Sequence, residues 1–180
     1  VNTYGQNTFT GNNTGATFNF STYSDALTNL PGTIGIDYEI DNVTIDVTHP
    51  ETTNLTIGLL SPNGITLTLK LDKIFYALWG DNFTNTVFQD GGSDINNVSP
   101  PYTGIFEPEG GTFASTFGGE DVSGLWTLEI ENFNGTEVGI LNSFEITFVA
   151  ICATPTNLSV SNITETSGNL DWDSEATATN

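Results

Sequence analysis

Alternation of apolar and polar side chains is the clearest pattern in this 180-residue chain. Residues 43–49 read Val-Thr-Ile-Asp-Val-Thr-His, so that Val43, Ile45 and Val47 face one way and the polar side chains face the other. A period of two with one apolar face is typical of a half-buried β-strand. The same alternation recurs at residues 55–60, 65–71, 125–131 and 141–148. No stretch has comparable helical periodicity, and we predict an all-β fold, an antiparallel β-sandwich or jelly roll.

Turn-forming residues separate these segments. Ser61-Pro62-Asn63-Gly64 lies between residues 55–60 and 65–71. Asn-Gly is favoured where both central residues of a turn need positive φ, and we expect a hairpin of this kind here. Residues 80–111 are rich in Gly, Asn, Asp and Pro, and we predict a loop-rich middle.

The chain divides into three parts by composition. Residues 1–14 are rich in Asn, Thr and Gly, and we interpret them as a linker or a loosely attached strand. Residues 15–151 form the predicted sandwich. Residues 152–180 change character after Cys152, the only cysteine, and we expect them to be a fragment of a second domain.

Charge excludes several classes of partner. The chain has two Lys, no Arg and 22 acidic residues, which gives a formal net charge of −20. Such a surface repels the phosphates of nucleic acids and of anionic membranes. No apolar run approaches the roughly 20 residues that span a bilayer, so membrane insertion is not expected. The acidity favours cations such as Ca²⁺, although solubility at a surface explains it equally well.

The sequence lacks the residues for common catalytic sites. A nucleophile activated by imidazole needs a histidine, and a zinc site needs several His, Cys or carboxylate ligands. The single histidine, His49, stands before Pro50 at the end of a predicted strand, and we interpret it as structural. Glu129, Glu131 and Glu145 alternate with apolar residues and are interpreted as solvated positions on strands. We therefore do not expect an enzyme.

Several motifs, taken in this order, resemble the P domain (homo B domain) of proprotein convertases over residues 30–148. The most specific are Leu60-Ser61-Pro62-Asn63-Gly64, Gly80-Asp81-Asn82-Phe83-Thr84-Asn85-Thr86-Val87-Phe88-Gln89-Asp90, Gly124-Leu125-Trp126-Thr127-Leu128 and Gly139-Ile140-Leu141-Asn142-Ser143-Phe144. The resemblance implies a non-catalytic module that supports the domains beside it, because the family's protease activity lies in a separate domain. Residues 155–172 resemble the first two strands of a fibronectin type III domain.

Calcium is the most plausible ligand on chemical grounds. Residues 80–90 are rich in Gly, Asn and Asp, and a loop of this composition can place carbonyls and carboxylates around a hard cation. We predict Asp81 and Asp90 as Ca²⁺ ligands, with Asp94 or Glu109 from neighbouring loops. The alternative is that these are polar turn residues that satisfy their own backbone.

Together these observations predict an extracellular or cell-surface module of a larger secreted, bacterial-type protein. It would stabilise or space the neighbouring domains of the same polypeptide. The alternative is an adhesin module that binds a glycan or another surface ligand through its loops, with Trp79 as one side chain that could stack on a sugar.

Overall fold

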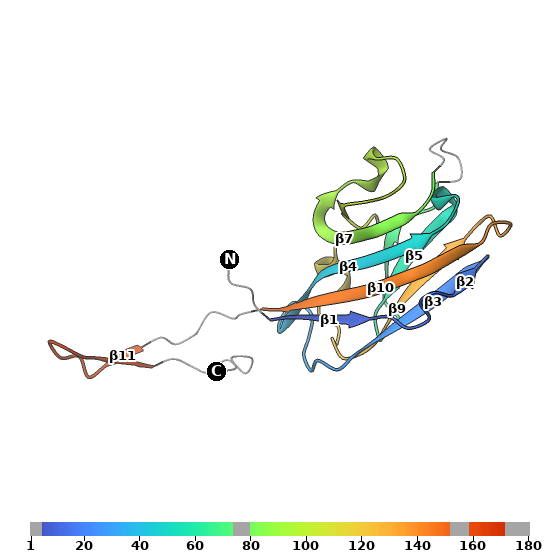
Figure 1. The fold of residues 1–180 in the computed structure, drawn as a ribbon. Coiled ribbons are helices and arrows are strands. Elements are labelled where there is room, and N and C mark those ends of the chain that lie inside the picture. The colour runs from blue at the N-terminus through green and yellow to red at the C-terminus, as the bar shows by residue number, and fades with distance from the viewer. Residues whose placement is uncertain (1–4, 74–79, 152–158, 172–180) are drawn as a thin grey trace.

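The computed structural model describes residues 5–73, 80–151 and 159–171. Two β-sheets pack against each other across most of these residues (Figure 1), which confirms the predicted all-β sandwich. The first sheet has the strand order β1-β10-β4-β7-β8, with β2 also paired to β10, and the second has the order β3-β9-β5-β6. Neighbouring strands in both sheets are antiparallel except β7 and β8, which are parallel.

The elements have the following bounds. The first sheet contains β1 (Gln6–Thr10), β2 (Thr17–Phe18), β4 (Tyr38–Thr48), β7 (Phe83–Ser93), β8 (Ile105–Phe106) and β10 (Gly139–Ala150). The second contains β3 (Ser21–Thr28), β5 (Leu55–Leu60), β6 (Thr66–Lys70) and β9 (Gly124–Asn132). The helical elements are the 3-10 turns η1 (Thr52–Asn54) and η2 (Ile95–Asn97) and the helix α1 (Phe113–Phe117). A separate hairpin consists of β11 (Ser159–Ser161) and β12 (Asn169–Asp171).

The predicted alternation places apolar side chains between the two sheets. All five predicted strand segments fall in β4, β5, β6, β9 and β10. Trp126 of β9 is 0% exposed, and its ring packs edge-on against Phe117 and Phe148 at centroid distances of 5.0 and 5.6 Å. Its indole Nε1 donates to the Val122 carbonyl at 2.9 Å, so the buried polar atom is satisfied.

The hairpin between β5 and β6 forms, but not through the predicted type of turn. Gly64 has φ of +83°, whereas Asn63 is not among the residues with positive φ. Pro62 restricts its own φ to about −65° and favours the first central position of an ordinary turn. The Gly64 amide donates to the Ser61 carbonyl at 2.9 Å, which closes the turn over Pro62 and Asn63.

The prediction of a loop-rich middle is wrong for residues 83–93, which form the eleven-residue strand β7. Phe83, Thr86 and Phe88 are its buried residues, so the inward positions are separated first by three residues and then by two. Asn85, with φ of +45°, lies at the irregular position. Three residues of β7 there span two of β4, and this bulge breaks the alternation that a sequence pattern needs.

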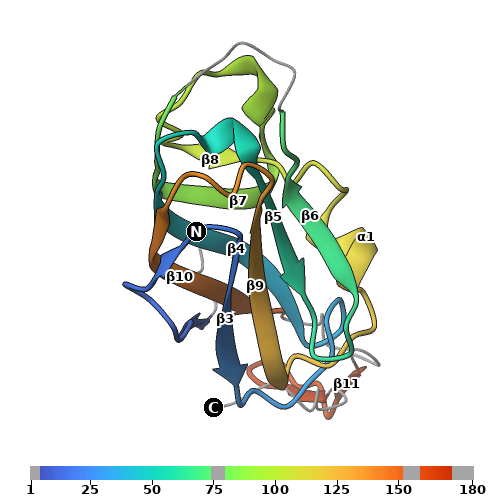
Figure 2. The same ribbon diagram turned by 90° about the vertical axis from the view of Figure 1, so that its right-hand side faces the viewer.

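Helix α1 was also not predicted, because five residues are too few to establish a helical period. Its N-terminus has a capping box in which Thr112 accepts from the Ser115 amide and Ser115 accepts from the Thr112 amide. Phe113 and Phe117 are buried, and α1 lies beside β6 (Figure 2). No helix in the described ranges is long and apolar enough to cross a membrane.

Two features of the sheet edges bear on function. The outer edge of β6 is covered by the loop after β8, where the Glu109 amide donates to the Leu69 carbonyl at 3.2 Å and the Gly110 amide to the Thr68 carbonyl at 2.9 Å. At the opposite side of the molecule, Gln6 of β1 pairs with Val149 of β10. The chain therefore runs into and out of the first sheet at the same end.

The predicted domain boundaries stay a prediction. The segment 1–14 contains β1, which pairs with β10 over five residues. The β11–β12 hairpin pairs Val160 with Leu170, and all of its side chains are exposed. Cys152, Trp79 and Trp172 lie outside the described residues.

Candidate functional site

The four predicted calcium ligands are not brought together as one group. Asp81 is exposed before β7, and Asp90 near the end of β7 accepts from the amides of Phe113 and Ala114 at 2.8 and 3.3 Å. Asp94 accepts from the Asn96 amide at 2.8 Å and thereby caps η2. Among the described residues, no three His, Cys, Asp or Glu side chains form a group that could hold a metal ion.

Asp94 and Glu109 do share one small pocket. It has a volume of about 220 Å³ and is lined by Asp94, Asn96, Glu107, Pro108 and Glu109. The pocket brings two of the predicted ligands into one place, together with Glu107, which was not predicted. The calcium site remains a prediction.

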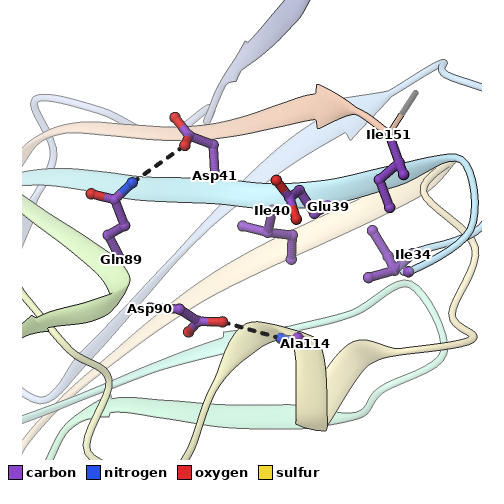
Figure 3. Close-up of a pocket in the computed structure, with 9 residues that line it drawn as sticks. Ile34, Glu39, Ile40, Asp41, Gln89, Asp90, Ala114 and Ile151 are labelled. Carbon is purple, nitrogen blue, oxygen red and sulfur yellow. Dashed lines mark hydrogen bonds between the residues drawn. The ribbon is translucent and has the colours of Figure 1, made fainter. Parts of the chain in front are cut away.

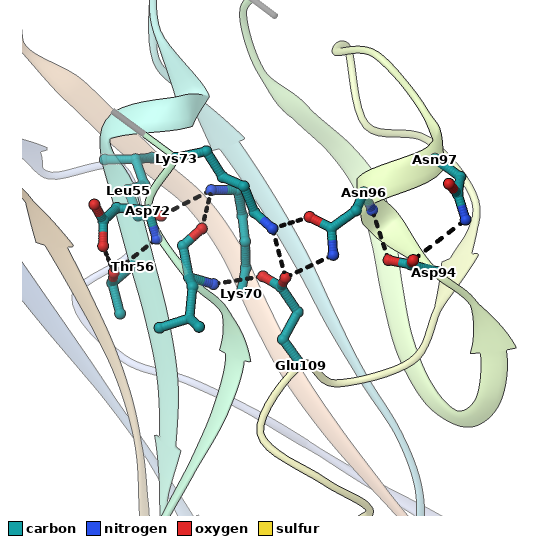
Figure 4. A network of polar contacts seen from close by, with 10 residues as sticks. Leu55, Thr56, Lys70, Asp72, Lys73, Asp94, Asn96, Asn97 and Glu109 are labelled. Carbon is teal, nitrogen blue, oxygen red and sulfur yellow. Dashed lines mark hydrogen bonds and ion pairs between the residues drawn. The ribbon is translucent and has the colours of Figure 1, made fainter. Parts of the chain in front are cut away.

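Both lysines of the chain lie in one polar network at the end of β6 (Figure 4). Lys70 is fully buried, and its ammonium donates to the carbonyls of Leu55 and Leu71 at 2.9 and 2.8 Å. Burial lowers the pKa of Lys70 from 10.5 to about 8, and the nearby charge of Glu109 opposes this shift. The network therefore contains a cation held by backbone dipoles within an otherwise mainly apolar interior.

Glu109 is the acceptor at the centre of this network. One carboxylate oxygen accepts from Lys73 Nζ and from Asn96 Nδ2, both at 2.8 Å, and the other accepts from the Leu71 amide. Burial raises the pKa of Glu109, but the hydrogen bonds from Lys73, Leu71 and Asn96 outweigh it, and the net pKa is below its ordinary value. The carboxylate fastens the loop after β8 and the turn η2 to the end of β6.

A larger pocket opens between β4, β7 and α1 (Figure 3). Its volume is about 420 Å³, and its lining combines apolar side chains with acidic ones: Ile34, Gly35, Glu39, Ile40, Asp41, Gln89, Asp90, Ala114 and Ile151. Gln89 donates to Asp41 at 3.3 Å across its rim. Glu39 pairs with Val149, which pairs with Gln6, so the pocket lies at the end where the chain joins and leaves the sheet.

His49 is held in the interior by contacts on both ring nitrogens. Its Nδ1 accepts from the Glu51 amide at 3.0 Å, and its Nε2 lies 3.2 Å from Asn132 Nδ2. The ring stacks on Phe18 with a centroid distance of 6.0 Å. Burial lowers the pKa of His49 and favours the neutral imidazole. The arrangement supports the structural interpretation of this residue.

Comparison with known protein families shows which family the chain belongs to. The sequence profile of the proprotein convertase P-domain matches residues 40–148, which is more than half of the chain. The chain belongs to the proprotein convertase P-domain family. This P domain contains β4 to β10, and the predicted family resemblance is therefore confirmed.

Solved structures similar to this P domain come from a bacterial protease. A crystal structure of the Aeromonas sobria serine protease in complex with its chaperone is 16% identical, with a TM-score of 0.46 over 82% of this chain and 27% of that chain. A second crystal structure of the A. sobria serine protease is 15% identical, with a TM-score of 0.45 over 82% of this chain and 26% of that chain. This P domain thus spans about a quarter of the protease chains it resembles. Comparison with curated proteins gave no significant match.

Sequence reasoning missed Lys73 and Asn96, which the fold brings to Glu109, a residue predicted as a calcium ligand. The three residues are far apart in the chain, and neither lysine was considered as a functional residue. Glu39 and Ile151 belong to opposite ends of the sandwich sequence and meet only because β4 pairs with β10. The only available signal was the rarity of lysine, which would have drawn attention to two cations three residues apart.

Proposed function

We propose that this P domain is a non-catalytic accessory module of a longer extracellular protein and that it stabilises a neighbouring domain by packing against it. The single observation that carries this proposal is the pocket beside the junction of β1 and β10. Neighbouring domains join the module at this end, because Gln6 and Val149 are partners in the first sheet. Membership of the P-domain family supports an accessory role.

The chemistry of the pocket indicates what it would contact. Ile34, Ile40 and Ile151 line the pocket with apolar side chains; Ile34 and Ile40 are buried, and the half-buried Ile151 belongs to the segment that leads out of the sandwich. Glu39 is exposed at the rim, and Asp41 lies beside it. Apolar surface with a rim of one charge favours a partner surface that has apolar side chains and a lysine or arginine.

The test compares the P domain alone with the P domain joined to its flanking domains. We expect Glu39→Lys to lower the melting temperature of the joined protein and to increase hydrogen exchange in β4 and β7, while leaving the isolated P domain unchanged. Glu131→Lys is the matched control, since Glu131 is exposed on the other sheet. Equal effects of the two substitutions in the joined protein would show that the pocket is not the contact surface.

Calcium would add stability if Asp94 and Glu109 bind it as predicted. Asp94 and Glu109 line one pocket, and a bound Ca²⁺ there would compete with Lys73 for the Glu109 carboxylate. We expect millimolar calcium to raise the melting temperature relative to excess EDTA, and Asp94→Asn to abolish the difference. Identical melting curves in calcium and EDTA would remove the metal from the proposal.

The adhesin alternative stays a prediction. Phe20, Tyr23 and Phe133 are exposed aromatic side chains that could contact a sugar. A glycan array probed with the folded domain tests this alternative, and an array without signal would exclude the glycans it displays.

A further inference from the structure

Three side chains from distant parts of the chain contact one another beside β6. Lys73 Nζ contacts the carbonyl oxygen of the Asn96 side chain. One oxygen of Glu109 accepts from Lys73 Nζ and from Asn96 Nδ2, each at 2.8 Å (Figure 4). Each of the three residues therefore touches the other two, and they come from the segment after β6, the turn η2 and the loop after β8.

This arrangement places an amine against a carboxamide with a carboxylate bridging both. A lysine amine is a nucleophile once it loses its proton, and a carboxyl group within hydrogen-bond distance can take up that proton and deliver it again. Holding the reacting groups in contact replaces a bimolecular encounter with an intramolecular step. The groups present are those required to transfer the acyl group of the asparagine from its own nitrogen to the lysine nitrogen.

The surroundings partly shield the pair from solvent. The side chains of Glu109 and Lys73 are only 10% and 24% exposed, and poorly solvated charges are stabilised less than in water. The fully buried Lys70 ammonium is close enough that the charge of Lys73 contributes to its lowered pKa, after the larger effect of burial. Asn96 is at the surface, which leaves a route for the departing nitrogen.

We propose that Lys73 and Asn96 form an intramolecular isopeptide bond and that Glu109 transfers the protons. Glu109 first takes a proton from the Lys73 ammonium, and the free amine attacks Cγ of Asn96. Glu109 passes this proton to Nδ2, then takes a second proton from the attacking nitrogen and passes it on as well, so that the bond between Cγ and Nδ2 breaks and the nitrogen leaves as ammonium. One amide bond forms and one breaks, the positive charge of Lys73 leaves with the ammonium, and nothing is oxidised or reduced.

The bond would connect two parts of the fold that otherwise meet through side-chain contacts. It would tie the end of β6 in the second sheet to η2, which follows β7 of the first sheet. A covalent link of this kind restricts the unfolded chain, because residues 73–96 become a closed loop. Without the bond, the ion pair and its hydrogen bonds leave the unfolded chain free, so a linked and an unlinked protein differ in stability.

The intact mass of the denatured protein is the decisive measurement. We expect the mass to be lower than the sequence mass by one ammonia. Lys73→Arg keeps the charge, and Asn96→Ala removes the carboxamide; both should restore the full mass, as should Glu109→Gln. Asn97→Ala is the matched control, because Asn97 contacts Asp94 and not the three residues, and it should keep the loss.

Trypsin locates the bond, because the chain offers it only Lys70 and Lys73. The unlinked chain gives a cut after each lysine, whereas the linked chain resists the cut after Lys73 and keeps residues 71–73 attached to the remainder. A wild-type mass equal to the sequence mass would overturn the proposal. So would an ammonia loss that persists in Lys73→Arg, since it would then arise from another asparagine.

Discussion

Lys70 carries a charge inside a sandwich whose other buried side chains are apolar or uncharged, and its stability effect can be calculated. The pKa falls from 10.5 to about 8 on folding because burial disfavours the ammonium. The unfolded chain therefore binds more protons between these two pH values, and the free energy of unfolding must rise as the pH increases from 8 to 10.5. At about 1.4 kcal/mol per pKa unit, the rise is about 3 kcal/mol.

Lys70→Met isolates this effect because methionine has a similar length and does not titrate. Urea unfolding followed by tryptophan fluorescence gives the free energy of unfolding of both proteins at each pH. We expect the wild type to gain about 3 kcal/mol relative to Lys70→Met between pH 8 and 10.5. Tyr23 and Tyr102 have raised pKa values but are present in both proteins, so their contribution cancels. Parallel pH profiles would refute the reasoning, whatever the absolute difference between the two proteins.

Three further predictions concern other parts of the sandwich. Burial lowers the pKa of His49, so the unfolded state takes up the extra proton at a higher pH than the folded state does. The melting temperature should therefore fall as the pH drops below 6.5. His49→Gln should flatten this dependence of melting temperature on pH, and an unchanged slope would contradict the lowered pKa of His49. A Cβ on Gly92 would lie 2.4 Å from the Phe106 carbonyl carbon, so Gly92→Ala should lower the free energy of unfolding by about 1–3 kcal/mol. Gly5→Ala is the control, because a Cβ there has no atom within 4 Å, and it should leave the free energy of unfolding unchanged. Asp90→Ala removes the acceptor for two amides of α1 and should lower the free energy of unfolding, measured by urea titration, by about 1 kcal/mol. An unchanged free energy of unfolding would show that these two hydrogen bonds do not stabilise the helix.

The regular strands could be predicted because their side chains alternate without interruption. Val43, Ile45 and Val47 of β4 are all fully buried, as the pattern required. β7 escaped prediction because the positive φ of Asn85 inserts a residue and reverses which side chains face inward. Such a bulge has no signature in the order of apolar and polar residues.

The polar site could not be predicted for a different reason. The composition indicated which residues could bind a cation. It did not indicate which neighbouring groups donate hydrogen bonds to the same oxygens in the folded protein. Asp90 accepts hydrogen bonds from backbone amides of α1, and Glu109 accepts them from Lys73, Asn96 and the Leu71 amide. These partners depend on how β7, η2 and the loop after β8 come together in space.

The pairing of Gln6 with Val149 has a consequence for mechanical load. Tension transmitted through the polypeptide acts on β1 and β10 at the same end, across the direction of the strands. The hydrogen bonds between them are then stretched one after another, as in opening a zipper, and not sheared together. A module connected in this way extends at low force, which suits a domain that rests against its neighbours better than one that must withstand pulling.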